Sequence, residues 1–327
     1  MSWILAGDVG ATKTLLCLID TATGSGVQAR YLTADFPSLQ SMLHVFYEKC
    51  NSELAIVPKP ECVCLGVAAP VQGDRACFTN LDLVVDAEEL RADLQVPQVR
   101  LINDFVATAY GILTLSPTDL YCLQEGTPRP CAPIVVLGAG TGLGQAYLTW
   151  AGDRYQVHPS EGSHSQFAPQ NQTELELLQW LWQRYPHASV ERVVSGQGIV
   201  NIYEFFASVY PDLPRLDLAN SAEPAGLIAA AVSTNQLATY TMGCFVSAYG
   251  AEAGNLAVKF LPYGGLYIAG GIAPKILPLL TEEGRFLQAM RQKEKMQQLL
   301  CEIPTYIVLN PEVGLLGTID QAKQMLV

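Results

Sequence analysis

The stretch GDVGATKT, residues 7–14, follows one run of apolar residues and leads into another. It differs from the Walker A pattern G-x-x-x-x-G-K-[ST] because Thr12 stands in place of the second glycine. A Walker A loop is also followed by a helix, whereas TLLCLID, residues 14–20, is an apolar segment that soon reaches a glycine-containing turn. We therefore predict a β-hairpin between two strands rather than a P-loop.

A hairpin of this composition can bind an anion through its backbone. Successive N–H groups around glycine form a concave nest, to which the Thr12 hydroxyl adds a donor. Asp8, at the end of the first predicted strand, could hold Mg²⁺ through a water molecule. The competing interpretation is an ordinary hairpin without a ligand, and the stretch alone favours neither.

The order of strand, glycine loop and strand recurs in residues 134–150, IVVLGAGTGLGQAYLTW. This loop is not a dinucleotide-binding fingerprint, because Leu143 occupies the place of the last glycine and a strand follows where a helix is needed. It predicts a second phosphate hairpin with Thr141 as a hydroxyl donor. A third element, IAGGIAP at residues 268–274, would let backbone approach a ligand closely, although Gly-Gly turns are common.

Length and internal similarity predict two domains. A chain of 327 residues exceeds what one hydrophobic core comfortably serves. Both halves open with an apolar strand, a glycine loop and a second strand, which suggests two related α/β domains that face each other across a cleft. Proline becomes frequent between residues 113 and 133, and such a segment marks a domain boundary.

Charge and cysteine content argue against several classes of protein. The net charge of -12, without a Lys/Arg cluster, disfavours a nucleic-acid partner. No apolar run approaches the length of a membrane span, and the N-terminus lacks the features of a signal peptide. The nine cysteines are scattered without a CxxC pair or metal-ligand spacing, which suits a reducing compartment. We predict a cytoplasmic protein.

Eight motifs, in this order, resemble the bacterial ATP-dependent glucokinases of the hexokinase/actin-like ATPase superfamily. They are GDVGATKT, TNLDL, LINDF, GAGTGLG, HPSEGSHSQFAP, ERVVSGQG, YIAGGIAPK and NPEVGLLG, and together they extend over nearly the whole chain. The resemblance implies two actin-like (ribonuclease H-like) α/β domains flanking a central cleft, of the hexokinase type. The smaller domain would comprise residues 1–113 with 309–327, and the larger one residues 114–308.

The same resemblance implies a homodimeric kinase that transfers the γ-phosphoryl group of Mg-ATP to the 6-hydroxyl of glucose. Asp104 would be the general base. The sugar ligands would be Asn80, Asn103, Asp104, Glu161, His164 and Glu191. The ATP contacts would be Asp8, Gly10, Thr12, Lys13, Gly138, Gly140, Thr141, Gly142, Gly270 and Gly271, with Asp8 also serving Mg²⁺.

Simpler interpretations exist for several of these residues. Asn103 and Asp104 stand where a helix would begin, so they could act as its N-cap. His164 could be an ordinary loop histidine, and Glu191 an exposed charge near a helix. The resemblance favours the ligand roles, because sugar hydroxyls both donate and accept and carboxylates bind them strongly.

The sequence also departs from the family pattern. Ala11 and Lys13 replace a glycine and an asparagine that are common in the first motif, and Lys13 either adds a cation near the phosphates or points to solvent. Ser163 and Gln166 replace a glycine and an aspartate around the histidine. These changes leave the sugar and the phosphoryl donor open.

Two alternative functions follow: a kinase for another hexose or amino sugar, and a catalytically weak sugar-sensing regulator. Retention of Asp8 and Asp104 favours a kinase, as does the expectation that no DNA-binding segment precedes Ser2.

Overall fold

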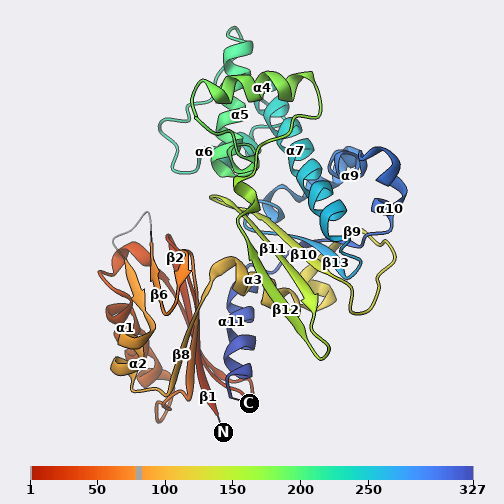
Figure 1. Cartoon of the computed structure of the whole chain (residues 1–327). Coiled ribbons are helices and arrows are strands. Elements are labelled where there is room, and N and C mark those ends of the chain that lie inside the picture. Colours follow the sequence, from red (N-terminus) through yellow and green to blue (C-terminus); the bar gives the residue numbers. More distant parts are fainter. Residues whose placement is uncertain (1, 79–82, 327) are drawn as a thin grey trace. The chain divides into compact units, whose positions relative to one another are not determined.

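A computed structural model of the chain describes residues 2–78 and 83–326. The chain divides into two compact units, Met1–Ser116 with Asn310–Val327, and Pro117–Leu309. Each unit is described by itself below, with the labels of Figure 1.

The first unit begins with a β-hairpin, as the sequence predicts. Within its described residues the elements are β1 (Trp3–Val9), β2 (Lys13–Asp20), β3 (Gly26–Leu32), η1 (Thr33–Asp35), α1 (Leu39–Glu53), β4 (Cys62–Val67), β5 (Val71–Gln72), β6 (Arg75–Cys77), β7 (Val84–Asp86), α2 (Ala87–Leu94), β8 (Gln98–Asn103), α3 (Asp104–Ile112) and α11 (Val313–Gln324). The described strands form a five-stranded sheet in the order β3-β2-β1-β4-β8 and a small sheet of β5, β6 and β7. β1 pairs antiparallel with β2 and parallel with β4, so a strand rather than a helix follows the glycine turn.

Alternation along β1 separates the two faces of the large sheet. Leu5 and Val9 pack into the core that α1 and α2 cover, whereas Ile4 and Ala6 pack toward α11. Asp8 has the parity of Ile4 and Ala6, so β1 presents it on the α11 face. Ser38 and Ser41 form a capping box at the start of α1.

Helices α3 and α11 cross so closely that only glycine fits at the contact. A Cβ built on Gly317 would lie 1.8 Å from the carbonyl oxygen of Ala107, and one on Gly111 would lie 1.9 Å from that of Val313. Backbone therefore packs on backbone, and α11 is locked to the helix that carries Asp104 as its first residue.

The second unit repeats the strand order of the first. Its elements are η2 (Pro117–Asp119), β9 (Leu120–Gln124), β10 (Ile134–Ala139), β11 (Leu143–Trp150), β12 (Tyr155–Ser160), η3 (Gly162–His164), α4 (Gln172–Trp182), η4 (Val190–Arg192), α5 (Gly196–Val209), α6 (Pro224–Ala230), α7 (Gln236–Phe260), β13 (Gly265–Ala269), η5 (Pro274–Ile276), α8 (Leu277–Thr281), η6 (Glu282–Gly284), α9 (Arg285–Arg291), η7 (Glu294–Met296), α10 (Gln297–Cys301) and β14 (Thr305–Val308). Its sheet has the order β12-β11-β10-β13-β14-β9. As in the first unit, an antiparallel hairpin, β10–β11, is followed by strands parallel to its first member.

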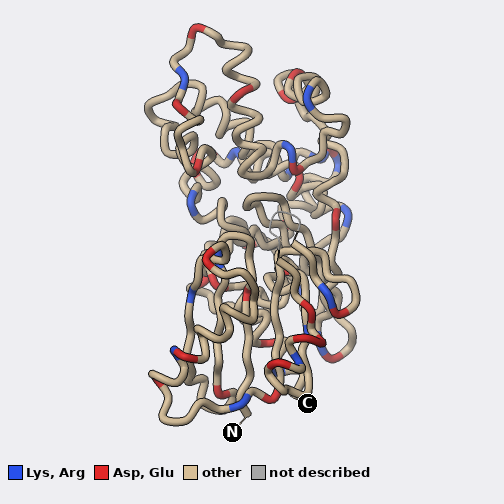
Figure 2. Tube along the Cα trace, turned by 90° about the vertical axis from the view of Figure 1, so that its left-hand side faces the viewer, with Lys and Arg blue, Asp and Glu red and all other residues tan. Residues whose placement is uncertain are grey.

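The long buried helix α7 forms the centre of the second unit and packs against α5 and α9 (Figure 1). Basic and acidic positions are mixed along the traces of both units, without a basic stripe in the view of Figure 2. Among residues 2–78 and 83–326, no helix is long and apolar enough to cross a membrane.

Candidate active site

The turn of the first hairpin is closed by its own backbone and held from behind by Thr33. The N–H of Gly10 donates to the carbonyl of Lys13 over 3.0 Å. The buried Thr33 donates its hydroxyl to the carbonyl of Gly10 (2.7 Å) and its N–H to the carbonyl of Thr12 (3.0 Å). Thr14 then donates its hydroxyl to that of Thr33 over 3.0 Å. These four hydrogen bonds fix the turn, while its tip, including Lys13, is exposed.

Asp8 lies against the first turn of α11. A Cβ on Gly314 would lie 2.8 Å from Oδ2 of Asp8, so the close approach requires glycine. Burial, and secondarily the charge of Asp104, raise the pKa of Asp8 from 3.8 to about 7. Among the described residues, no basic side chain lies within ion-pair distance of Asp8. Asp8 is therefore a carboxylate near a second one, without an ion-pair partner among the residues that the structure describes.

This raised pKa has a consequence for stability. Between about pH 4 and pH 7 native Asp8 holds its proton more tightly than the unfolded chain does, so the free energy of unfolding falls as the pH rises through this window. Asp8→Asn removes that penalty. We expect the unliganded variant to be more stable than wild type by about 1–3 kcal/mol at pH 8, and by much less at pH 5.

Urea unfolding at both pH values measures this difference. Asp93→Asn, at an exposed position of α2, is the matched control and should change stability by less than about 0.5 kcal/mol. An Asp8→Asn effect of the same size at pH 5 and pH 8 would show that the charge on Asp8 is not what destabilises the native state.

Asn103 and Asp104 stand at the carboxyl end of β8 and the start of α3. Asn103 is the N-cap, since its Oδ1 accepts from the N–H groups of Phe105 (3.0 Å) and Val106 (3.3 Å). Oδ1 of Asp104 also accepts from the N–H of Phe105, over 2.8 Å. The capping interpretation is thus confirmed for Asn103. Asp104 is the first residue of α3, where the helix dipole stabilises its carboxylate.

The second hairpin is also a closed glycine turn. The N–H of Gly140 donates to the carbonyl of Gly142 over 2.8 Å, and the N–H of Gly196 donates to the carbonyl of Gly140 over the same distance. A Cβ on Gly140 would meet nothing within 4 Å, so this side of the turn is open. Thr141 is exposed, and Gly138 is buried in β10. Gly270 has a φ of 81° and packs on Ala139, the last residue of β10.

The loop that carries Glu161 and His164 pairs with the segment before Glu191. Residue 190 donates its N–H to the carbonyl of Ser165 (2.9 Å), and His187 donates Nε2–H to the carbonyl of His164 (2.7 Å). His164 Nε2 lies 3.8 Å from Glu161 Oε2, and both side chains are largely exposed. The structure thus places three predicted sugar ligands on adjoining segments of one unit.

A buried amide, Gln145, supports this loop. Its Nε2 donates to Oε1 of the buried Glu252 over 2.9 Å, which turns its carbonyl oxygen toward the loop. A Cβ on Gly162 would lie 2.3 Å from that oxygen, so the loop rests directly on Gln145. Asn255 donates to the second oxygen of Glu252, also over 2.9 Å, so each oxygen of this buried carboxyl group accepts a hydrogen bond.

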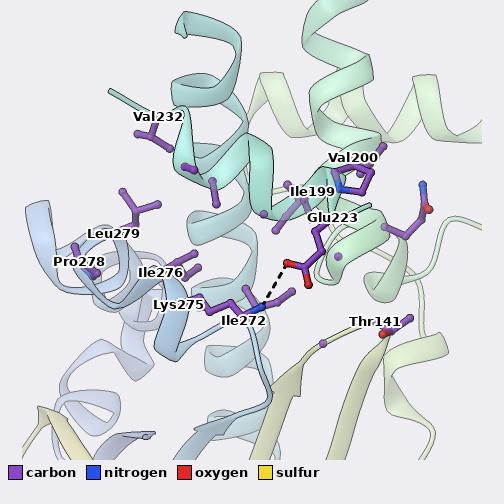
Figure 3. A pocket seen from close by; sticks show the side chains of 18 of the residues that line it. Thr141, Ile199, Val200, Glu223, Val232, Ile272, Lys275, Ile276, Pro278 and Leu279 are labelled. Atoms are coloured by element: carbon purple, nitrogen blue, oxygen red, sulfur yellow. Dashed lines mark ion pairs between the residues drawn. The ribbon is translucent and has the colours of Figure 1, made fainter. Parts of the chain in front are cut away.

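A cavity of about 820 Å³ opens beside the second hairpin. Gly140 and Thr141 line one end, and the walls are mainly aliphatic side chains from α5, α6, η5 and α8 (Figure 3). Glu223 and Lys275 face each other across it, with Nζ and Oε2 3.8 Å apart. An apolar cavity next to a glycine turn suits a ligand with a flat apolar part and a polar chain.

The structure brings the predicted residues together in two groups. The first unit contains Asp8, Gly10, Thr12, Lys13, Asn103 and Asp104. The second unit contains Gly138, Gly140, Thr141, Gly142, Glu161, His164, Glu191, Gly270 and Gly271. Asn80 lies outside the described residues. Sequence reasoning missed Thr33 and Gln145, whose importance depends on strand register, and the helical wall of the cavity.

Comparison with known proteins agrees with this geometry. The family model described as Glucokinase matches residues 5–325. The chain belongs to the glucokinase family. It is 47% identical to a glucokinase of Nostoc punctiforme, over 97% of this chain and 98% of that protein. It is 42% identical to a glucokinase of Synechocystis sp., over 98% of each chain. A solved glucokinase from an Antarctic psychrotroph has a TM-score of 0.83 and 29% identity over 99% of both chains. Both the resemblance and the α/β hexokinase-type fold class predicted from the sequence are confirmed.

Proposed function

We propose that this chain transfers the γ-phosphoryl group of ATP to the 6-hydroxyl of glucose, giving glucose 6-phosphate and ADP. Family membership supports the reaction class. The proposal rests on the aliphatic cavity that Gly140 and Thr141 line at one end. ATP needs an apolar cavity for its base and backbone N–H groups for its phosphates. Gly270, packed on the end of β10, would help to shape the adenosine end, together with Gly271.

Asp104 would act as the general base for the sugar hydroxyl. It is the first residue of α3, directly after the end of β8, and the Asn103 cap fixes the backbone there. Phosphoryl transfer demands little covalent chemistry from a protein, so positioning and proton acceptance are its main contributions. Asn103, Glu161, His164 and Glu191 would hold the sugar hydroxyls, and Asn80 would add a further contact.

The chemistry of the Asp8 site fits Mg²⁺. Asp8 and Asp104 are neighbouring carboxylates without a cation beside Asp8 among the described residues, and oxygen ligands are what Mg²⁺ prefers. Asp8 would hold the ion through water, beside the hairpin turn, where the backbone N–H and the hydroxyl of Thr12 would address the phosphates and Gly10 would let them approach the backbone closely. When bound, Mg²⁺ neutralises phosphate charge.

We further propose that the enzyme works in the cytoplasm as a homodimer. All nine cysteines are free thiols in this structure, in keeping with a reducing compartment. The dimer follows from the family resemblance and is tested by the mass of the purified protein in solution.

A panel of hexoses and amino sugars with Mg-ATP tests the function. We expect sugar-dependent ADP release that is fastest with glucose. Faster turnover of another sugar would identify a different hexose kinase. Sugar binding without turnover would identify the regulator that the sequence left open, and would overturn the kinase assignment.

A further inference from the structure

The side chain of Glu191 contacts the second hairpin. Its Oε2 accepts a hydrogen bond from the backbone N–H of Leu143, over 2.9 Å, where β11 begins. A Cβ built on Gly142 would lie 2.6 Å from the same oxygen. The carboxylate therefore lies directly against the returning end of the turn, although its side chain is only half-buried.

The segment that follows Glu191 holds the other end of the same turn. Ser195 donates its hydroxyl to the carbonyl of Glu191 over 2.7 Å and accepts from the N–H of Gly198 as the N-cap of α5. The next residue, Gly196, donates its N–H to the carbonyl of Gly140. Residues 191–196 thus hold the turn at Gly140 and at Leu143, on either side of the exposed Thr141.

We propose that Glu191 is a positioning residue for the nucleotide, in addition to a sugar ligand. Its Oε2 fixes the turn that lines the cavity, which leaves Oε1 for a sugar hydroxyl. The inference rests on the proposed function, because it takes the cavity as the nucleotide site. Its consequence is that nucleotide affinity depends on Glu191 even when no sugar is present.

Two substitutions of Glu191 separate its two roles. Glu191→Gln keeps a carbonyl oxygen that can accept from Leu143, whereas Glu191→Ala removes the acceptor and leaves a half-buried N–H unpaired. Binding of a fluorescent ADP analogue is measured without sugar. We expect Glu191→Ala to weaken it by about 10-fold, in line with the loss of one charge-assisted hydrogen bond, and Glu191→Gln by less than about 3-fold.

Glucose affinity is measured in parallel by calorimetry, without nucleotide. Both variants should bind glucose at least about 10-fold more weakly, because each loses the charge that strengthens hydrogen bonds to sugar hydroxyls. Glu204→Ala, at an exposed position of α5, is the matched control and should leave both affinities unchanged.

Gly142→Ala provides an independent test if Glu191→Ala does not fold. The added methyl would displace the carboxylate, so a change in the phosphate hairpin should weaken glucose binding by at least about 5-fold in the absence of nucleotide. Unchanged ADP affinity in folded Glu191→Ala, or unchanged glucose affinity in Gly142→Ala, would overturn the positioning role. If Glu191→Ala binds ADP more weakly but both Glu191 variants bind glucose normally, the positioning role is confirmed and the sugar role is refuted.

Discussion

Replacing Asp104 by asparagine is expected to lower kcat for glucose phosphorylation by at least about 100-fold, the usual contribution of a general base. The physical reason is that an amide cannot accept the proton of the sugar hydroxyl. Asparagine has nearly the shape of aspartate and keeps an oxygen to accept from the N–H of Phe105, so the start of α3 should be preserved. The KM values for glucose and ATP should change far less than kcat.

Steady-state kinetics with coupled detection of ADP measure this effect, with Asp93→Asn as the matched control in the same unit. The melting temperature of the Asp104→Asn variant reports whether α3 is intact. Sugar-dependent ADP release at the wild-type rate would show that Asp104 is not the base.

A second large effect is expected at the crossing of α3 and α11. Gly317→Ala would place a methyl group 1.8 Å from the carbonyl oxygen of Ala107, and no side-chain movement can relieve a clash with helix backbone. The two helices must separate, which we expect to cost about 3 kcal/mol or more of unfolding free energy. Because α3 carries Asp104 and α11 lies against Asp8, activity should fall even where the variant is folded.

The control is the same substitution in another helix. A Cβ on Gly243, in α7, would meet only the guanidinium end of Arg285 at 3.1 Å, and that exposed side chain can move. Gly243→Ala should change stability by less than about 1 kcal/mol, with the gain in helix propensity offsetting the contact. Equal effects of the two substitutions would contradict the close helix crossing.

Much of the fold could be predicted because its signals are local. The apolar runs on both sides of GDVGATKT indicated a hairpin, and its turn contains the glycine whose N–H closes it. Ser38 stood immediately before an apolar-periodic segment and proved to be the cap of α1. Cys62 and Cys64 alternate along β4 and share the face toward α11, as their spacing predicts. The short strands β5, β6 and β12 and the helices α8 to α10 contain too few residues to give a clear periodic signal in the sequence.

The site could be predicted only in part, because several of its contacts join distant segments. The role of Thr33 depends on the register of β3 against β2, which no local pattern encodes. In the sequence Gln145 is only one polar residue in a strand, and its role becomes visible only from its contacts with Glu252 and Gly162. The sequence left Glu191 between an exposed charge and a sugar ligand, and neither interpretation indicates that its carboxylate accepts from a backbone N–H of the second hairpin. Tertiary packing decides each of these.

The most direct test of the central claim is the identity of the product. Purified protein is incubated with glucose and Mg-ATP, and the reaction is followed by phosphorus NMR. The proposed function predicts that glucose 6-phosphate and ADP accumulate in equal amounts. ADP without a sugar phosphate, phosphate on another hydroxyl, or no reaction in protein that binds glucose would contradict it.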